Sequence, residues 1–239
     1  MNNNKTSIDN IIKETIKSSF EILKELNKIG FSEKTKLTIP NYQNNQSEDE
    51  DGATRVSEQE LRFVFIEQLI KRLPEGYYYS IETPTDRPYR FSEKGIGNVS
   101  PVREEGQSGN FDLTILNKDQ NKDKQLVAII EFKAKSSSPH AYAKDFCKLW
   151  NPNEGQGENT YRYFINVFES ITKRTRNSFV DKITSSNNEH SFKKQPGDID
   201  VWVVCKSLKE GQTCFEFEGW DSDLENLIDK TGVFFLGRR

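Results

Sequence analysis

The sequence contains few of the residues that build disulfide frameworks, zinc sites and hydrolase triads. Its 239 residues include three cysteines and two histidines: Cys147, Cys205, Cys214, His140 and His190. The cysteines are odd in number and lack paired metal-ligand spacing, which argues for reduced thiols and against zinc. Neither histidine has a nucleophile with a plausible partner, so a hydrolase triad is not supported.

Long apolar runs are also missing. No stretch approaches the roughly 20 apolar residues of a membrane-spanning helix, and the first ten residues, MNNNKTSIDN, resemble neither a signal peptide nor a transit peptide. We therefore expect a cytoplasmic protein with no membrane partner. With 33% hydrophobic and 30% charged residues, the composition predicts a soluble chain large enough for one domain with a substantial core.

The chain lacks a strong charge of either sign. Its 34 Lys and Arg residues and 37 Asp and Glu residues give a formal net charge of -3. A protein that grips a DNA duplex through many phosphates usually has a basic surface overall. The balance therefore argues against tight, metal-independent DNA binding, although an enzyme with an acidic metal site needs only a local concentration of basic residues.

Two segments with the pattern of strands, 111–116 and 125–133, each contain an acid at a position where burying a carboxylate would cost free energy. Asp112 lies in the first pattern, and Glu131 lies near the end of the second, two residues before Lys133. Residues i and i+2 of a strand share a face, so Glu131 and Lys133 are predicted to lie side by side. If residues 117–124 form the turn, Asp112 falls opposite Ile129 and is a diagonal neighbour of Glu131.

This arrangement predicts a metal site. Two neighbouring carboxylates repel each other unless a cation lies between them, and hard oxygen ligands suit Mg²⁺ or Mn²⁺. A lysine beside them can orient water, transfer a proton if its pKa is lowered, or stabilise charge on a phosphate. The structural alternative is that Asp112 caps a strand end and Glu131 pairs with Lys133 on an exposed strand. The apolar residues on both faces before Glu131 favour a central strand, and hence a site.

Asp112, eighteen intervening residues and then Glu131-Phe132-Lys133 resemble the PD-(D/E)xK nuclease superfamily, the fold of many restriction endonucleases, Holliday-junction resolvases and phage-defence nucleases. The resemblance implies that Asp112 and Glu131 bind the metal and that Lys133 assists the attacking water. Phe111 stands where the family name has proline. The resemblance also implies DNA as the substrate and a role in restriction or phage defence.

Members of this superfamily often add an acid from the helix that precedes the sheet. A helix is expected over 57–73, and Glu60 is the candidate ligand by resemblance. Ser57 and Glu60 also match a capping box, in which Glu60 satisfies backbone donors at the helix start. Glu67, seven residues later and on a similar face, is the rival ligand.

The N-terminal part reads as a helix followed by a polar linker. Residues 7–29 have apolar side chains at helical spacing, and an acidic, polar stretch covers 41–54. We expect a boundary near residue 55, between an N-terminal helix with its linker (1–54) and a nuclease-like domain (55–239). The apolar stripe of this helix can cover the core or form a surface for a homodimer or partner protein.

The remaining pattern predicts an α/β fold. We expect a strand over 76–82, an irregular loop over 83–108 and a helix over 139–149. A segment over 160–171 is a helix or a buried strand, and its spacing fits a helix better. Further strands over 199–205 and 212–218, a helix over 221–229 and a last strand from 232 follow. The order matches the αβββαβ core of restriction-endonuclease-like proteins, a mixed central sheet flanked by helices.

Several basic residues are candidates for contacts with backbone phosphates. They are Arg103, Lys144, Lys148, Lys173, Arg174 and Arg176. Each single lysine is expected to be solvated, and the three residues from 173 to 176 can alternatively cap a helix. The sequence thus predicts an Mg²⁺- or Mn²⁺-dependent nuclease acting on DNA. A non-catalytic nuclease-fold module is the alternative, and a phosphodiesterase acting on small nucleotides is a third.

Overall fold

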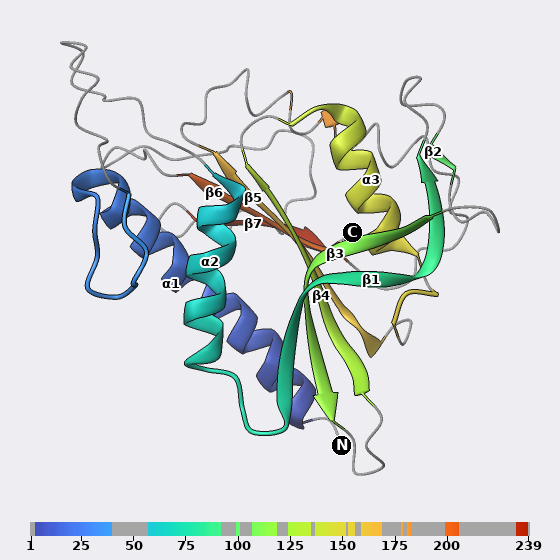
Figure 1. The fold of residues 1–239 in the computed structure, drawn as a ribbon, viewed down its shortest axis with the longest axis horizontal. Coiled ribbons are helices and arrows are strands. Elements are labelled where there is room, and N and C mark those ends of the chain that lie inside the picture. Colours follow the sequence, from blue (N-terminus) through green and yellow to red (C-terminus); the bar gives the residue numbers. More distant parts are fainter. Residues whose placement is uncertain are drawn as a thin grey trace.

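The fold is described from a computed structural model. The structure describes residues 3–39, 57–91, 99–100, 107–118, 124–134, 137–151, 153–155, 159–168, 178, 181–182, 199–205 and 233–238. In this part the chain is an α/β protein with one mixed sheet and three helices (Figure 1). None of the described helices combines the length and the apolar character that a membrane crossing needs.

The helices are α1 (Asn3–Ile29), α2 (Glu58–Ile70) and α3 (Pro139–Trp150). The strands are β1 (Tyr77–Phe91), β2 (Val99–Ser100), β3 (Gln107–Lys118), β4 (Lys124–Ala134), β5 (Tyr161–Phe168), β6 (Ile199–Cys205) and β7 (Val233–Arg238). They form a sheet in the order β2-β1-β3-β4-β5-β6-β7. The pairs β4–β5 and β5–β6 are parallel, and the other pairs are antiparallel.

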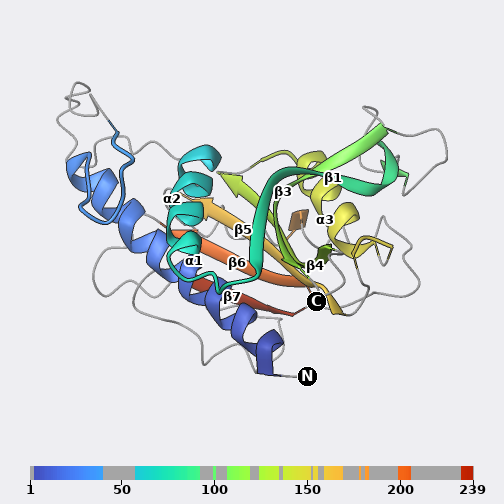
Figure 2. The same ribbon diagram turned by 60° about the horizontal axis from the view of Figure 1, so that its bottom comes forward.

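The helices cover the sheet on both faces (Figure 2). One buried cluster joins the apolar residues of α1 and α2 to one face of the sheet, and a second joins α3 to the other face. Phe132 of β4 belongs to the first cluster, where its ring lies 5.3 Å from that of Phe65 on α2. Ile129 of the same strand belongs to the second cluster. β4 is therefore a central strand, as its apolar residues predicted.

Helix α1 belongs to the main core. Its stripe, which includes Ile12, Phe20 and Leu23, is buried in the same cluster as α2 and the sheet. The hydroxyl of Tyr163 on β5 donates a hydrogen bond of 2.5 Å to Asp9, which ties the helix to the sheet. Of the two predicted uses of this stripe, covering the core is the one observed. The predicted boundary near residue 55 lies outside the described residues.

Of the two predictions for 160–171, the favoured helix is wrong and the buried strand is correct for the described part, which is strand β5. All residues from Arg162 to Phe168 are buried, because β5 lies between two parallel neighbours and is covered on both faces. A strand covered on both faces shows no alternation of apolar and polar residues. The match of its apolar residues to helical spacing is therefore coincidental. Its aromatic and β-branched content was the better signal.

Strand β1 is longer than predicted. Pairing with β3 continues from Tyr77 to Tyr89, through much of the expected loop, with an irregularity between Pro84 and Pro88. Proline has no backbone N–H to donate to the ladder, so within a strand it is tolerated mainly at such irregularities. The expected elements over 212–218 and 221–229 lie outside the described residues.

The predicted register between β3 and β4 is also wrong. Leu116 pairs with Leu126 and not with Gln125, and an irregularity between Ile115 and Leu116 adds a second shift of one residue, so that Leu113 pairs with Ile130. One step further along, Asp112 lies across from Glu131 and not from Ile129. A bulge of this kind inserts an extra residue into one strand and cannot be read from the lengths of two strand patterns.

Candidate functional site

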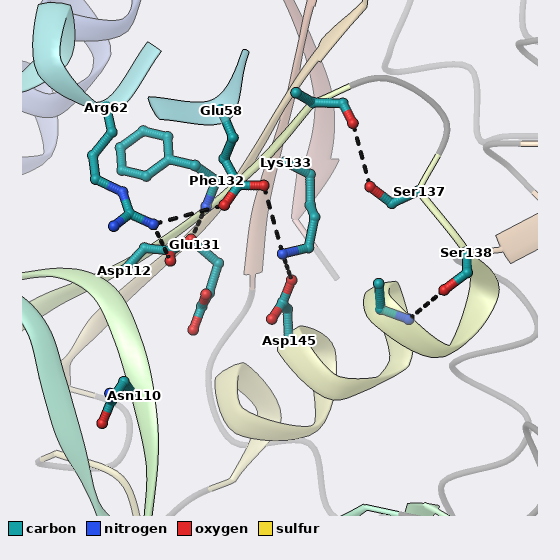
Figure 3. A network of polar contacts seen from close by, with 12 residues as sticks. Glu58, Arg62, Asn110, Asp112, Glu131, Phe132, Lys133, Ser137, Ser138 and Asp145 are labelled. Atoms are coloured by element: carbon teal, nitrogen blue, oxygen red, sulfur yellow. Dashed lines mark hydrogen bonds and ion pairs between the residues drawn. The ribbon is translucent and has the colours of Figure 1, made fainter. Parts of the chain in front are cut away.

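Charged side chains from four elements meet where β4 leads towards α3 (Figure 3). Strand β3 contributes one acid, β4 an acid and a lysine, α2 an acid and an arginine, and α3 an acid and a lysine. They are Asp112, Glu131, Lys133, Glu58, Arg62, Asp145 and Lys148. The predicted trio of Asp112, Glu131 and Lys133 is thus brought together, within a larger set of charges.

Glu131 is the most deeply buried acid of this set. Its side chain is 1% exposed, and Lys148 Nζ lies 2.5 Å from its Oε1. Burial, followed by the negative charge of Asp145, raises the pKa of Glu131 well above its ordinary value, against the opposing effect of Lys148. Asp112 adds to the rise. The carboxylates are therefore close enough to repel one another and need cations nearby.

Lys133 is held by acids from both flanking helices. Its Nζ lies 2.7 Å from Asp145 Oδ2 and 3.9 Å from Glu58 Oε2. Burial disfavours the ammonium, but Asp145 and Glu58 outweigh it and raise the pKa of Lys133 above its ordinary value. The side chain is therefore a cation at neutral pH. It is suited to orienting water or stabilising phosphate charge, and not to accepting a proton.

Asp112 links three elements. Its Oδ1 lies 2.5 Å from Arg62 Nη2, and its Oδ2 accepts a 2.7 Å hydrogen bond from the backbone N–H of Phe132. Arg62, whose side chain is 7% exposed, also lies 2.5 Å from Glu82 Oε1. Asp112 is thus fixed by β4 and α2, and the orientation of its carboxylate depends on Arg62.

Glu82 has an unusual backbone. Its φ of +48° lies in the left-handed region that non-glycine residues rarely adopt. It lies between the pairs Ile81–Leu113 and Thr83–Phe111, which places it opposite Asp112. Strained residues of this kind concentrate at functional sites. Here the strained position carries the second carboxylate bound by Arg62.

The acid of α2 that reaches Lys133 is Glu58, which the sequence analysis missed. It lies 3.7 Å from Arg62 Nη2, one helical turn away. Burial raises the pKa of Glu58, Lys133 opposes this, and Asp112 and Asp145 add to the rise. An i, i+4 pair of acid and arginine at a helix start was the available signal.

The two acids that were predicted on α2 lie differently. Glu60 is buried in the first turn, and its backbone N–H donates to the Ser57 hydroxyl at 3.5 Å, so the predicted N-cap is present. Glu67 accepts hydrogen bonds from the Thr35 hydroxyl and the Lys36 backbone. Glu67 therefore contacts the segment after α1, and its rival role as a ligand is not supported. A role for Glu60 at the metal stays a prediction.

Lys148 is buried, and the prediction of a solvated lysine is wrong for it. Its side chain is 9% exposed and contacts Glu131, Asp145 and the backbone carbonyl of Asn110. The sequence analysis missed Asp145. The signal for both residues was their place beside the apolar stripe of α3, which the helix turns towards the sheet. Helix α3 begins as predicted, with Ser138 as N-cap and proline next.

The other basic candidates contribute little to this description. Lys144 on α3 is half-buried. Arg103, Lys173, Arg174 and Arg176 lie outside the described residues. Their predicted contacts with phosphates stay predictions.

The donor atoms of the site suit a hard divalent cation. Buried carboxylate oxygens are the ligands that Mg²⁺ and Mn²⁺ prefer. Among the described residues, however, no three Asp, Glu, His or Cys side chains are grouped so as to hold a metal ion. Asp112 faces Arg62, Glu131 faces Lys148, and Asp145 faces both lysines. The chemistry fits a metal, which would have to share these oxygens with cations of the chain.

Comparison with known proteins gives no assignment. No protein-family model matches the sequence, and neither the curated proteins nor the solved structures gave a match. A function is therefore inferred from the geometry of the site.

Proposed function

We propose that this chain is a metal-dependent nuclease that hydrolyses phosphodiester bonds of DNA, with a PD-(D/E)xK core. The observation that carries the proposal is the meeting of Asp112, Glu131 and Lys133 at the end of β4, between α2 and α3. Among the described residues, the order α2, β1, β3, β4, α3, β5, into which the two-residue β2 is inserted, supports it. A role in restriction or phage defence follows from the resemblance alone.

In this proposal Asp112 and Glu131 hold Mg²⁺ or Mn²⁺. When bound, the ion polarises the phosphate and lowers the pKa of the attacking water. Arg62 and the N–H of Phe132 orient Asp112 by binding its two oxygens. Preorganised charges of this kind lower the barrier because they need not reorient during the reaction.

Lys133 acts as an ammonium. Since its pKa is raised, it donates hydrogen bonds to the attacking water or to a phosphate oxygen and does not take up the proton. Asp145 fixes its position through the 2.7 Å contact. Asp145 is therefore a positioning residue for Lys133.

One observation favours the alternative of a non-catalytic module that binds nucleic acid or a partner protein. Each carboxylate of the predicted pair already faces a cation of the chain, and no group of three ligands is present in the described part. A module of this kind binds DNA with no turnover. Cleavage separates the two functions.

The test is cleavage of supercoiled plasmid and linear DNA in Mg²⁺, Mn²⁺ or EDTA. The parent should cut only with metal, and Lys133→Ala should lose activity by about 10²-fold or more, as expected when a group that stabilises transition-state charge is removed. Lys124→Ala, an exposed lysine on the same strand, is the matched control and should cut like the parent.

The products extend the test. Nicked plasmid indicates attack from within, and shortened linear DNA indicates attack from the ends. Inhibition of cutting by cyclic nucleotides at low concentration would favour the small-nucleotide phosphodiesterase. DNA binding without cutting in either metal would contradict the proposal and support the module.

A further inference from the structure

The ammonium of Lys148 is surrounded by oxygens in the manner of a bound cation. Its Nζ lies 2.5 Å from Glu131 Oε1, 2.7 Å from the backbone oxygen of Asn110 and 3.3 Å from Asp145 Oδ1. These oxygens come from β4, β3 and α3. The ammonium of this buried lysine thus lies among protein oxygens in place of water, with a hydrogen bond to Asn110 and ion pairs to the two carboxylates.

The same ammonium occupies one of the two oxygens through which Glu131 can bind a metal ion. Oε1 of Glu131 cannot bind both the Lys148 ammonium at 2.5 Å and a divalent ion tightly. Two cations around one oxygen repel each other strongly in a buried site. Binding of metal through Oε1 therefore requires Lys148 to withdraw, and binding through Oε2 places a second cation on a carboxylate that Lys148 already neutralises. The affinity for metal then depends on the cost of this withdrawal.

We propose that Lys148 is the internal counter-ion of the metal site: its ammonium neutralises Glu131 when no metal is bound and is displaced from Glu131 by a divalent cation. The inference rests on the proposed function, because it takes Glu131 as a metal ligand. It adds a residue that sets the metal affinity of this site.

The neighbours of Lys148 allow the withdrawal. Asp145 contacts both lysines, with Oδ2 towards Lys133 and Oδ1 towards Lys148. A displaced ammonium retains Asp145 and the Asn110 carbonyl as partners, so it is not left as an unpaired buried charge. The flexible four-carbon stem lies against Gly109, where an added Cβ would be 3.5 Å from the lysine Cδ. A methyl-sized space therefore lies beside the stem of Lys148, next to Thr85.

The test measures binding of Mn²⁺ to the full chain by calorimetry, without DNA. Lys148→Met removes the competing charge and keeps the apolar stem, so the dissociation constant for Mn²⁺ should fall by about tenfold or more relative to the parent. Lys13→Met is the control, since it also removes a partly buried, ion-paired lysine, on α1. Its Mn²⁺ affinity should equal that of the parent.

Thermal unfolding gives a second readout. Without metal, Lys148→Met should melt below the parent, because Glu131 loses its cation. At the same excess of Mn²⁺, the melting temperature of the variant should rise by more than that of the parent. A ligand at concentration L that binds only the folded state stabilises it by RT ln(1 + L/Kd), which grows as Kd falls. If Lys148→Met fails to fold with or without metal, Lys148→Gln, which keeps a donor for Asn110, takes its place in both measurements.

Equal or weaker Mn²⁺ binding by the charge-removing variant would overturn the counter-ion role. Cleavage of DNA by the parent tests the proposed function separately. If the parent cuts DNA and the variant binds Mn²⁺ no more tightly than the parent, the inference about Lys148 is wrong and the proposed nuclease activity stands. If the parent never cuts DNA and the variant binds Mn²⁺ more tightly than the parent, the proposed nuclease activity is wrong and the inference about Lys148 stands.

Discussion

At the scale of single residues, the site consists of paired charges in a poorly solvated place. Taking a charge out of water is costly, and the cost is offset only when a partner of opposite sign is close. Arg62 illustrates this, because it binds Asp112 and Glu82 and is itself 7% exposed. Removing such a residue leaves two carboxylates without their cation.

We therefore expect Arg62→Met to destabilise the fold. The loss in the free energy of unfolding should be about 3 kcal/mol, near the lower end for breaking a buried ion pair because Glu82 is half exposed and can regain water. Urea denaturation followed by circular dichroism measures it. Lys34→Met breaks an exposed pair with Glu25 and should cost less than about 1 kcal/mol. Similar losses in both variants would contradict the account of Arg62.

The residues of the site differ in how far the sequence could predict them. Asp112, Glu131 and Lys133 were found because their spacing matches a motif and because strand geometry places Glu131 beside Lys133. Arg62 lies fifty positions before Asp112, and no local pattern links residues so far apart. Lys148 was taken as solvated because an isolated lysine usually is, and only the packing of α3 on the sheet buries it.

At the scale of secondary structure elements, long-range hydrogen bonds hold β1 to the segment between α3 and β5. The Tyr89 hydroxyl donates a 2.7 Å hydrogen bond to Glu154 Oε1 and accepts one of 2.8 Å from Asn151 Nδ2. Glu154 Oε2 accepts from the backbone N–H of Asp86, and the Glu154 carbonyl accepts from Arg162. The far half of β1 is thus fastened to the segment between α3 and β5.

Tyr89→Phe tests this connection. Loss of the hydroxyl leaves buried partners unsatisfied and should cost about 1–3 kcal/mol. Amide hydrogen exchange should accelerate over residues 83–89 of β1 and stay unchanged over 77–81, where pairing with β3 is independent of the tie. Tyr78→Phe, at an exposed position, should change the free energy of unfolding by less than about 0.5 kcal/mol. Unaltered exchange over 83–89 in Tyr89→Phe would contradict the role of the tie.

The type of an element could be predicted where its apolar residues had a clear period. The prediction failed where an element is buried on two faces. Helices α1, α2 and α3 each show a helical pattern or a cap that the sequence displays. For β5 a helix was favoured over a buried strand, because Tyr163, Phe164 and Val167, which are buried on two faces at once, also fit helical spacing. The register of β3 with β4 depends on where the turn begins, since Lys118 still pairs with Lys124, and on a bulge, which is decided by packing and not by the number of residues in the turn.

At the scale of the whole molecule, the sheet separates two cores, and α1 covers one of them. The sequence predicted residues 1–54 as an N-terminal part separate from the main domain, because a polar, acidic stretch over 41–54 follows the first helix. The structure shows that the apolar stripe of α1 and the faces of α2 and β4 form one buried cluster. The support of the site therefore includes α1, since α2 carries Glu58 and Arg62 and packs against it.

Phe20→Ala tests whether α1 is needed by the whole fold. Phe20 is fully buried, and truncating a buried phenylalanine costs about 3–5 kcal/mol through lost burial and the cavity left behind. Because one cluster spans α1, α2 and the sheet, we expect a single unfolding transition that moves to lower urea for every probe. Ile29→Ala, on the exposed end of the same helix, should move it by less than about 0.5 kcal/mol. If the sheet keeps the stability of the parent in Phe20→Ala, then α1 is an appendage after all, and the positions of Glu58 and Arg62 do not depend on it.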